Sequence, residues 1–486
     1  LKKGNTFKQS EKVSISNSAS LLFAGNGTNN GADQIKRLSV EEGGTVGFEG
    51  NNQGKLFITD NSGNAEVVLN NAGSIALNEL EQNNNKQAIT VNSGRISAAE
   101  SLSITGSLVN EEGGVIDSKL FDQSRPNNAG NANATIANAD SIELSDQFWM
   151  RGVSLDNSGS IAASQLNYRN KGGEIDNSGV LDIAGTIRFW GDAGNSSGVS
   201  FVNSGTLNVA DGIKQDAGKT TVSLTNTAGT ATLGGESTYT GSTDIQGGEL
   251  IVNGVLSDVT PVSVDTEGTY QVNETDTIGS LEGAGSIQIA SGETLIAGWL
   301  NTNTAVSGVI SGGGGFTKVG IGTTTFSGLN TYDGETIVNG GVLIAGAENA
   351  FSKKSKAIVN EGGVVNLGGL EQSVENISLR GGELRNGSLD GGAVEVLGSG
   401  FIDGVGQSDD ENPASLVVDG LDYGGYLTLT GANRFADLTL KNGKALLGSI
   451  RKGALGSHAL VLDGGVIGSS DRDALVLNGA LTLGNG

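Results

Sequence analysis

A short turn recurs along the first half of the chain and constrains the fold more than any other feature. It consists of Asn, a small residue and Gly, with Ile or Leu within two further residues. The copies are Asn71-Ala72-Gly73, Asn92-Ser93-Gly94, Asn157-Ser158-Gly159, Asn177-Ser178-Gly179 and Asn203-Ser204-Gly205. Neighbouring copies lie 21, 65, 20 and 26 residues apart. Because 65 is close to three periods, the structural unit is about 22 residues long.

Each unit contains short segments in which apolar and polar residues alternate, as in "GTLNVADGI" from Gly205 to Ile213. Alternation over three to five residues indicates half-buried β-strands. No sustained helical periodicity with capping residues occurs, so few helices are expected. The chain has 80 glycines among 486 residues, a frequency that suits turns at short intervals.

A unit of this size cannot bury its own apolar face, whereas stacked units can. We therefore expect an all-β fold, a parallel β-helix of about 22 coils and roughly 100 Å, with one strand spacing per coil. Ile, Leu, Val and Ala are expected to point inward. Thr, Ser, Asn and acidic residues are expected to point outward.

A second repeat lies further along the chain. Residues 238–252, "TYTGSTDIQGGELIV", align without a gap on residues 331–345, "TYDGETIVNGGVLIA". A looser copy occupies residues 433–447, where Lys441 falls in an apolar column. Because a shift of one residue turns a strand over, we expect that coil to be shifted or weak.

The stretch "SGVISGGGGFTKVGIGTTTFSGLNTYDGETIVNGGVLIAG", residues 307–346, resembles the passenger-associated repeat of Gram-negative autotransporters. The resemblance implies a type V secreted passenger, a right-handed parallel β-helix displayed on the cell surface. Its export would use its own C-terminal outer-membrane barrel, from which it could be cleaved. The sequence ends at "LTLGNG" without barrel strands after it, so we expect the passenger alone. A chain without cysteine suits threading through such a barrel.

We expect one continuous solenoid, which divides into three parts according to the repeat motif that each part carries. Residues 1–231 carry the Asn-Ser-Gly turns, and residues 232–368 carry the passenger-associated repeats. Residues 369–486 form the C-terminal coils, which the resemblance implies could act like an autochaperone.

The sequence offers little support for catalysis. His458 is the only histidine, and the Gly-x-Ser-x-Gly match at residues 194–198 lacks the strand–turn–helix setting of a nucleophile elbow. The acidic run at residues 407–413 reads as a solvated loop. We expect no enzyme activity, no cofactor and no metal site. A formal net charge of −24 also argues against a nucleic-acid partner.

One group of residues suggests a binding face. Trp149, Tyr168 and Trp190 lie 19 and 22 residues apart, each with an arginine within two positions: Arg151, Arg169 and Arg188. One coil apart means stacked on one face, and aromatic rings with guanidinium groups suit sugars, sulfated glycans or peptides. The alternative is that the aromatic side chains point inward or cover a local bulge.

Three functions follow as hypotheses. The first is a non-enzymatic surface adhesin for host extracellular-matrix glycoproteins, such as fibronectin, or for glycans such as glycosaminoglycans. The second is self-association between passengers on neighbouring bacteria, which would drive aggregation and biofilm formation. The third, a polysaccharide-degrading enzyme, would need converging carboxylates, and the sequence shows no such spacing.

Overall fold

The structure is a computed structural model. It describes residues 12–23, 33–48, 54–59, 66–83, 88–124, 134–169, 173–190, 198–216, 221–406, 414–419, 426–430, 433–436, 438–447, 460–462, 465–469 and 481–483. Regular secondary structure in these residues is entirely β-strand. None of them belongs to a helix of the length and hydropathy that crossing a membrane requires.

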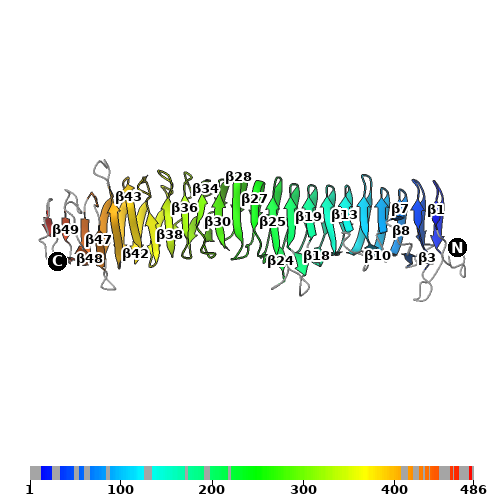
Figure 1. Cartoon of the computed structure of the whole chain (residues 1–486), viewed down its shortest axis with the longest axis horizontal. Helices are drawn as coiled ribbons and strands as arrows, with labels where there is room; N and C mark the ends of the chain where they lie inside the picture. Colours follow the sequence, from blue (N-terminus) through cyan, green and yellow to red (C-terminus); the bar gives the residue numbers. More distant parts are fainter. Residues whose placement is uncertain are drawn as a thin grey trace. The chain divides into compact units, whose positions relative to one another are not determined.

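The chain divides into two compact units, residues 1–243 with 248–250 and residues 244–247 with 251–486. In both units the strands pair in parallel with strands one turn away, and Figure 1 shows them side by side in sequence order. The expected all-β parallel solenoid is therefore confirmed. Its handedness, its continuity and its three-part division by repeat style remain predictions.

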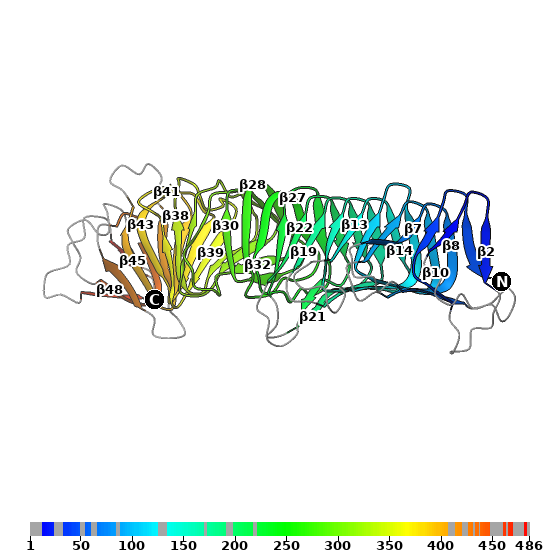
Figure 2. The ribbon, with the colours of Figure 1, turned by 45° about the vertical axis from the view of Figure 1, so that its right-hand side comes forward.

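The strands of the first unit stack in three columns. The first column contains β1 (Val13–Ile15), β4 (Leu38–Val40), β7 (Glu66–Asn71), β9 (Ala88–Asn92), β11 (Ser107–Asn110), β13 (Ala134–Asn138), β16 (Val153–Asn157), β19 (Gly173–Asn177), β22 (Val199–Asn203) and β25 (Val222–Asn226). The second contains β2 (Ser20–Phe23), β5 (Thr45–Phe48), β14 (Ser141–Leu144), β17 (Ser160–Ala163), β20 (Val180–Ile183), β23 (Thr206–Val209) and β26 (Thr230–Leu233). The third contains β3 (Asp33–Ile35), β6 (Lys55–Ile58), β15 (Gln147–Arg151), β18 (Gln165–Arg169), β21 (Ile187–Trp190) and β24 (Ile213–Gln215). Three long strands run through both the second and third columns: β8 (Ser74–Gln82), β10 (Arg95–Thr105) and β12 (Val115–Ser124). The turned view of Figure 2 shows β21 on a different side of the coil from β19 and β22.

Strand β27 (Thr243–Val252) has residues in both units. The strands after it again form columns. One contains β28 (Pro261–Val272), β30 (Ser280–Gly283), β33 (Thr304–Val306), β36 (Thr323–Phe326), β38 (Gly341–Ala345), β40 (Gly363–Asn366), β43 (Glu383–Leu389), β45 (Gly400–Val405), β47 (Tyr426–Thr430), β48 (Leu438–Leu447) and β50 (Gly465–Ser469). Another contains β29 (Asp276–Ile278), β32 (Thr294–Ala297), β35 (Gly315–Lys318), β37 (Thr336–Val338), β39 (Lys356–Asn360), β42 (Asn376–Arg380), β44 (Ala393–Leu397), β46 (Ser415–Asp419), the first half of β48, β49 (Leu460–Leu462) and β51 (Leu481–Leu483). Shorter runs are β31 (Ser286–Ile289) and β34 (Ile310–Gly312), which follow the end of β28, and β41 (Glu371–Gln372), which pairs with the end of β43.

The described residues form a solenoid of about 17 turns. The 22-residue unit predicts about 22 coils over the whole chain.

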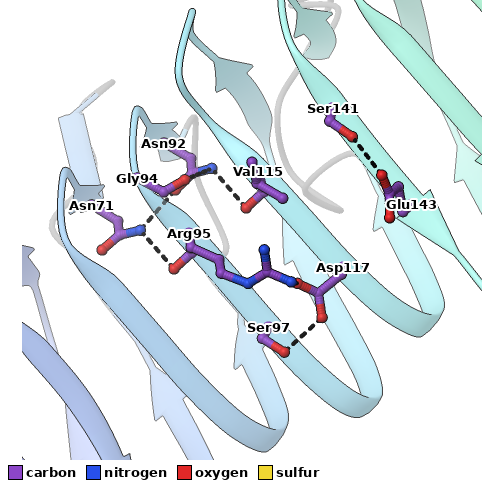
Figure 3. A network of polar contacts seen from close by, with 9 residues as sticks. All are labelled: Asn71, Asn92, Gly94, Arg95, Ser97, Val115, Asp117, Ser141 and Glu143. Carbon is purple, nitrogen blue, oxygen red and sulfur yellow. Dashed lines mark hydrogen bonds and ion pairs between the residues drawn. The ribbon is translucent and has the colours of Figure 1, made fainter.

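The recurring asparagines of the first unit point inward, which corrects the expectation that Asn faces outward. Each ends a strand of the first column and has an exposed fraction of 0–1%: Asn71, Asn92, Asn110, Asn138, Asn157, Asn177, Asn203 and Asn226. The Nδ2 of each of the first seven donates to the Oδ1 of the next asparagine over 2.7–2.8 Å. Figure 3 shows the start of this asparagine ladder, where Asn71 donates to both Asn92 and the carbonyl of Arg95. A buried amide column is stable because each member satisfies the next.

Each turn has a glycine because the backbone of the neighbouring turn lies too close for a side chain. A Cβ placed on Gly179 would lie 2.0 Å from the carbonyl oxygen of Gly159, which is itself the glycine of the preceding turn. No side chain fits at that distance, so the stacked turns require glycine at this corner.

The second repeat places a tyrosine inside each copy. Tyr239 and Tyr332 are both 0% exposed, and their hydroxyls lie 2.6 Å and 2.5 Å from the hydroxyls of Thr243 and Thr336. The gapless alignment of the two segments therefore corresponds to the same buried Tyr–Thr contact in both. A buried tyrosine needs such a partner for its hydroxyl, which explains the Thr four residues later.

The looser third copy is shifted at Lys441, as expected. In the pairing of β46 with β48, Val418 lies opposite Leu440 and Asp419 lies opposite Asn442, so that Lys441 is an extra residue. Its side chain is exposed. A one-residue bulge thus keeps the charged side chain out of the apolar column.

Candidate functional site

The predicted aromatic and arginine residues lie on three consecutive parallel strands of the third column, β15, β18 and β21. The register places Trp149 opposite Asn167, which lies opposite Arg188, and Arg151 opposite Arg169, which lies opposite Trp190. Alternate residues of these strands are buried: Phe148, Met150, Leu166, Tyr168, Ile187 and Phe189. Successive side chains of a strand point to opposite faces, so Trp149, Arg151, Arg188 and Trp190 face outward. We call these four residues the Trp–Arg cluster.

Tyr168 does not belong to the outward face, and its assignment to the predicted ladder is corrected here. It is 1% exposed, and its ring centroid lies 5.3 Å from that of Phe189. The intervals of 19 and 22 residues place the aromatics on neighbouring turns. They do not fix the face, which depends on whether a residue is odd or even along its strand.

The two indoles come together although their strands are separated by β18. Their ring centroids are 6.2 Å apart with an interplanar angle of 25°, a stacked arrangement. Trp149 Nε1 donates to Gln147 Oε1 over 2.7 Å, and Trp190 Nε1 donates to Asn167 Oδ1 over 3.1 Å. Both indole N–H groups therefore have acceptors on the same outward face. The two rings are half-buried, so part of their aromatic surface is accessible.

An arginine guanidinium group also lies against the ring of each tryptophan. The guanidinium carbon of Arg151 lies 4.6 Å from the ring centroid of Trp149, and that of Arg188 lies 3.8 Å from the ring centroid of Trp190. These distances are those of cation–π contacts. The stacking holds both rings and both guanidinium groups in one fixed arrangement.

The arginines are also paired with carboxylates from neighbouring turns. Arg151 Nε lies 2.9 Å from Asp122 Oδ1, and Arg188 Nη2 lies 3.1 Å from Asp216 Oδ1. Their side chains are 37% and 40% exposed, so these are partly solvated ion pairs. The cluster is therefore close to electrically neutral. Chemically it offers ring stacking and hydrogen-bond donors rather than a strong positive field.

Arg169 lies in the same outward column, between Arg151 and Trp190. It is exposed. Of the six residues predicted for the binding face, the structure thus places five on one outward face and moves Tyr168 to the core.

The sequence features screened for catalysis fall largely outside the described residues. His458 and the acidic run at residues 407–413 lie outside them, as do residues 194–197 of the Gly-x-Ser-x-Gly match. Within the described part of the chain, no group of three or more His, Cys, Asp or Glu side chains could hold a metal ion.

The sequence did not reveal two buried ionisable groups, because nothing in the sequence around each residue distinguishes it from an ordinary strand residue. Asp276 is 1% exposed, accepts hydrogen bonds from the Leu256 amide over 3.0 Å and the Tyr270 hydroxyl over 3.2 Å, and burial raises its pKa to about 7. Lys318 is also 1% exposed. Its Nζ donates to the carbonyls of Val319 and Gly320, and burial lowers its pKa to about 8.

Comparison with known proteins supports the resemblance seen in the repeats. The family model for the passenger-associated-transport-repeat matches residues 228–252 and 316–345. The chain is 28% identical over 336 residues to the adhesin BmaC autotransporter of Brucella suis biovar 1 (strain 1330), an alignment that covers 64% of this chain and 9% of that protein. The chain therefore matches only a small part of its relative's length, and no solved structure matches it. It carries passenger-associated-transport repeats on a passenger-like β-solenoid and is a distant homologue of an autotransporter adhesin.

Proposed function

We propose that this adhesin-like passenger attaches bacteria to host extracellular-matrix glycoproteins or glycans through the Trp–Arg cluster. The observation that supports the proposal is the stacked pair of indoles on an outward face, with both Nε1–H groups already bonded inside that face. Such rings are fixed before a ligand arrives, so little side-chain entropy is lost on binding. The passenger homology implies a location at the cell surface or outside the cell, and we propose that an outer-membrane barrel anchors or releases the chain.

The charges of the cluster narrow the class of ligand. Arg151 and Arg188 already have carboxylate partners, so a sulfate group would have to compete with Asp122 and Asp216. Contact of a neutral sugar ring with the exposed part of an indole would leave both ion pairs in place. Within the glycans considered, we therefore favour neutral sugar rings of matrix glycoproteins over heavily sulfated chains.

The proposed role is non-enzymatic. It is supported by the relative, which is named an adhesin. The four residues of the Trp–Arg cluster include no carboxyl group, whereas glycoside hydrolysis typically uses a pair of carboxyl groups.

The test is a binding screen of the purified chain on immobilised fibronectin, laminin, collagen and neutral and sulfated glycans. The double variant Trp149→Ala, Trp190→Ala should lose saturable binding by tenfold or more, about the effect of removing an interface hot spot. The matched control is Trp299→Ala, which removes a 55% exposed indole from the other unit. Equal binding by the wild type and the double variant would exclude the cluster, and binding that follows sulfation alone would overturn the preference for neutral rings.

A further inference from the structure

The second unit contains a long segment whose surface carries no charge. Between Thr294 and Tyr332 the sequence has one charged residue, Lys318, although 29 basic and 53 acidic residues occur in the chain. Lys318 is 1% exposed and donates to backbone carbonyls, so it adds no charged group to the surface. We call residues 294–332 the uncharged band.

The same band exposes large apolar side chains. Of the ten such side chains that are exposed in the described part of the chain, five belong to it, with exposed fractions from 39% to 83%: Trp299, Leu300, Val309, Ile321 and Leu329. Isolated exposed apolar residues are ordinary, but a group of them within about two turns marks an interaction surface.

Three of these residues share one corner of the solenoid. Trp299 and Leu300 lie in the turn after β32, and Ile321 lies in the equivalent turn after β35. The Ile321 amide donates to Asn301 Oδ1 over 2.8 Å, and the Leu300 amide donates to the Gly279 carbonyl over 3.0 Å. The first bond joins the two turns directly, and the second joins the earlier of them to the turn after β29. We call Trp299, Leu300 and Ile321 the apolar corner.

Two asparagine side chains beside the apolar corner already form hydrogen bonds within the protein. Asn301 Nδ2 donates to the Trp299 carbonyl over 3.1 Å, and Asn303 Oδ1 accepts from the Thr323 amide over 2.9 Å. A sugar would need amide or carboxylate groups directed at its hydroxyls. The apolar corner instead offers hydrophobic area, and both polar atoms of the neighbouring Asn301 side chain are already bonded.

We propose that the apolar corner is a docking surface for a second copy of the same chain. Two copies with a formal charge of −24 each repel one another over most of their surfaces. Repulsion is least where both present the uncharged band, and a two-fold axis through that band would place each Trp299 and Ile321 against the partner's corner. The proposal assigns a surface to self-association and is independent of ligand binding by the Trp–Arg cluster.

The test is sedimentation velocity of the full chain over a wide concentration range. The wild type should show a reversible monomer–dimer equilibrium whose dissociation constant falls as salt is raised, because salt screens repulsion between like-charged bodies. Ile321→Asp and Trp299→Ala should each raise the dissociation constant tenfold or more. Both residues are exposed, so the fold should be retained, and circular dichroism and thermal unfolding check this.

Two matched controls distinguish a specific contact at the apolar corner from a general effect of substituting exposed apolar residues. Leu397→Asp adds the same charge at a 37% exposed apolar residue of the same unit outside the band, and should leave the dissociation constant within twofold. The Trp149→Ala, Trp190→Ala variant should also dimerise normally. A monomeric wild type at all concentrations, or equal weakening by Leu397→Asp, would overturn the proposal. Binding of the wild type to zwitterionic lipid vesicles without dimerisation would assign the corner to membranes instead and would equally overturn it.

Discussion

At the scale of single residues, the first unit depends on asparagines that bury their amides in a continuous column. Each member between the two ends accepts from the preceding asparagine and donates to the next one over 2.7–2.8 Å, and all members are buried. Outside such a column a buried amide would lose its hydrogen bonds to water without replacement. The ladder therefore explains why the turn begins with Asn rather than with another turn-forming residue.

Replacing a central member tests this dependence. Asn157→Ala would remove one of the acceptors of Asn138 Nδ2 and the asparagine that donates to Asn177 Oδ1, and should lower the free energy of unfolding by about 1–3 kcal/mol. Hydrogen exchange of the neighbouring turns measures the loss locally, which suits a repeat protein better than one global midpoint. The control is Asn273→Ala, since Asn273 makes the same 2.7 Å amide bond to Asn253 but is exposed. A similar loss in both variants would show that burial of the ladder is unimportant.

Asp276 gives the second unit a dependence on pH. Burial raises its pKa from 3.8 to about 7, against the lowering effect of its hydrogen bonds from Leu256 and Tyr270. Between about pH 4 and pH 7 the folded state then holds a proton that the unfolded state has lost, so the free energy of unfolding falls as pH rises, by up to about 4 kcal/mol. Above about pH 7 this contribution is gone.

The variant Asp276→Asn keeps the size and the acceptor oxygen but does not titrate. Its unfolding free energy should change less between pH 4 and pH 7 than that of the wild type, and it should be the more stable protein at about pH 8. Chemical denaturation at a series of pH values measures both. If the two proteins have parallel pH profiles, Asp276 titrates normally in the folded state.

At the scale of the elements, the sequence was sufficient for the strands and their parallel stacking, because the turns repeat and the strands alternate. It was not sufficient for the face on which each residue lies. The Asn of each turn was expected outside and is inside, since a polar residue can be buried when the same residue recurs one turn away. Tyr168 shows the opposite error, because its interval from Trp149 gave the turn but not the register.

Strand β48 offers a test of register. Lys441 is the extra residue of its pairing with β46 and is exposed, so Lys441→Leu should change the free energy of unfolding by no more than about 0.5 kcal/mol. Leu440, one position earlier, is 1% exposed, and Leu440→Lys should be strongly destabilising. Thermal unfolding followed by circular dichroism compares the two. A large gain in stability from Lys441→Leu would place residue 441 in the core and remove the bulge.

At the scale of the whole molecule, the two units present different surfaces. The first carries the Trp–Arg cluster, where arginine charges are balanced by Asp122 and Asp216. The second carries the uncharged band with its exposed apolar side chains. Outward residues of a solenoid can vary while the stacked core stays the same, so we expect binding to depend on these surfaces. The sequence alone identified the first surface through its aromatic spacing.

The central claim is that the chain is an adhesin that binds matrix ligands through the Trp–Arg cluster. The most direct test is to display the chain on a non-adherent Gram-negative host through an autotransporter barrel, and to count cells attached to matrix-coated surfaces. We predict attachment well above that of cells displaying the barrel alone, and its loss in the Trp149→Ala, Trp190→Ala variant at equal surface expression. Absence of attachment, or attachment that survives the double substitution unchanged, would contradict the claim.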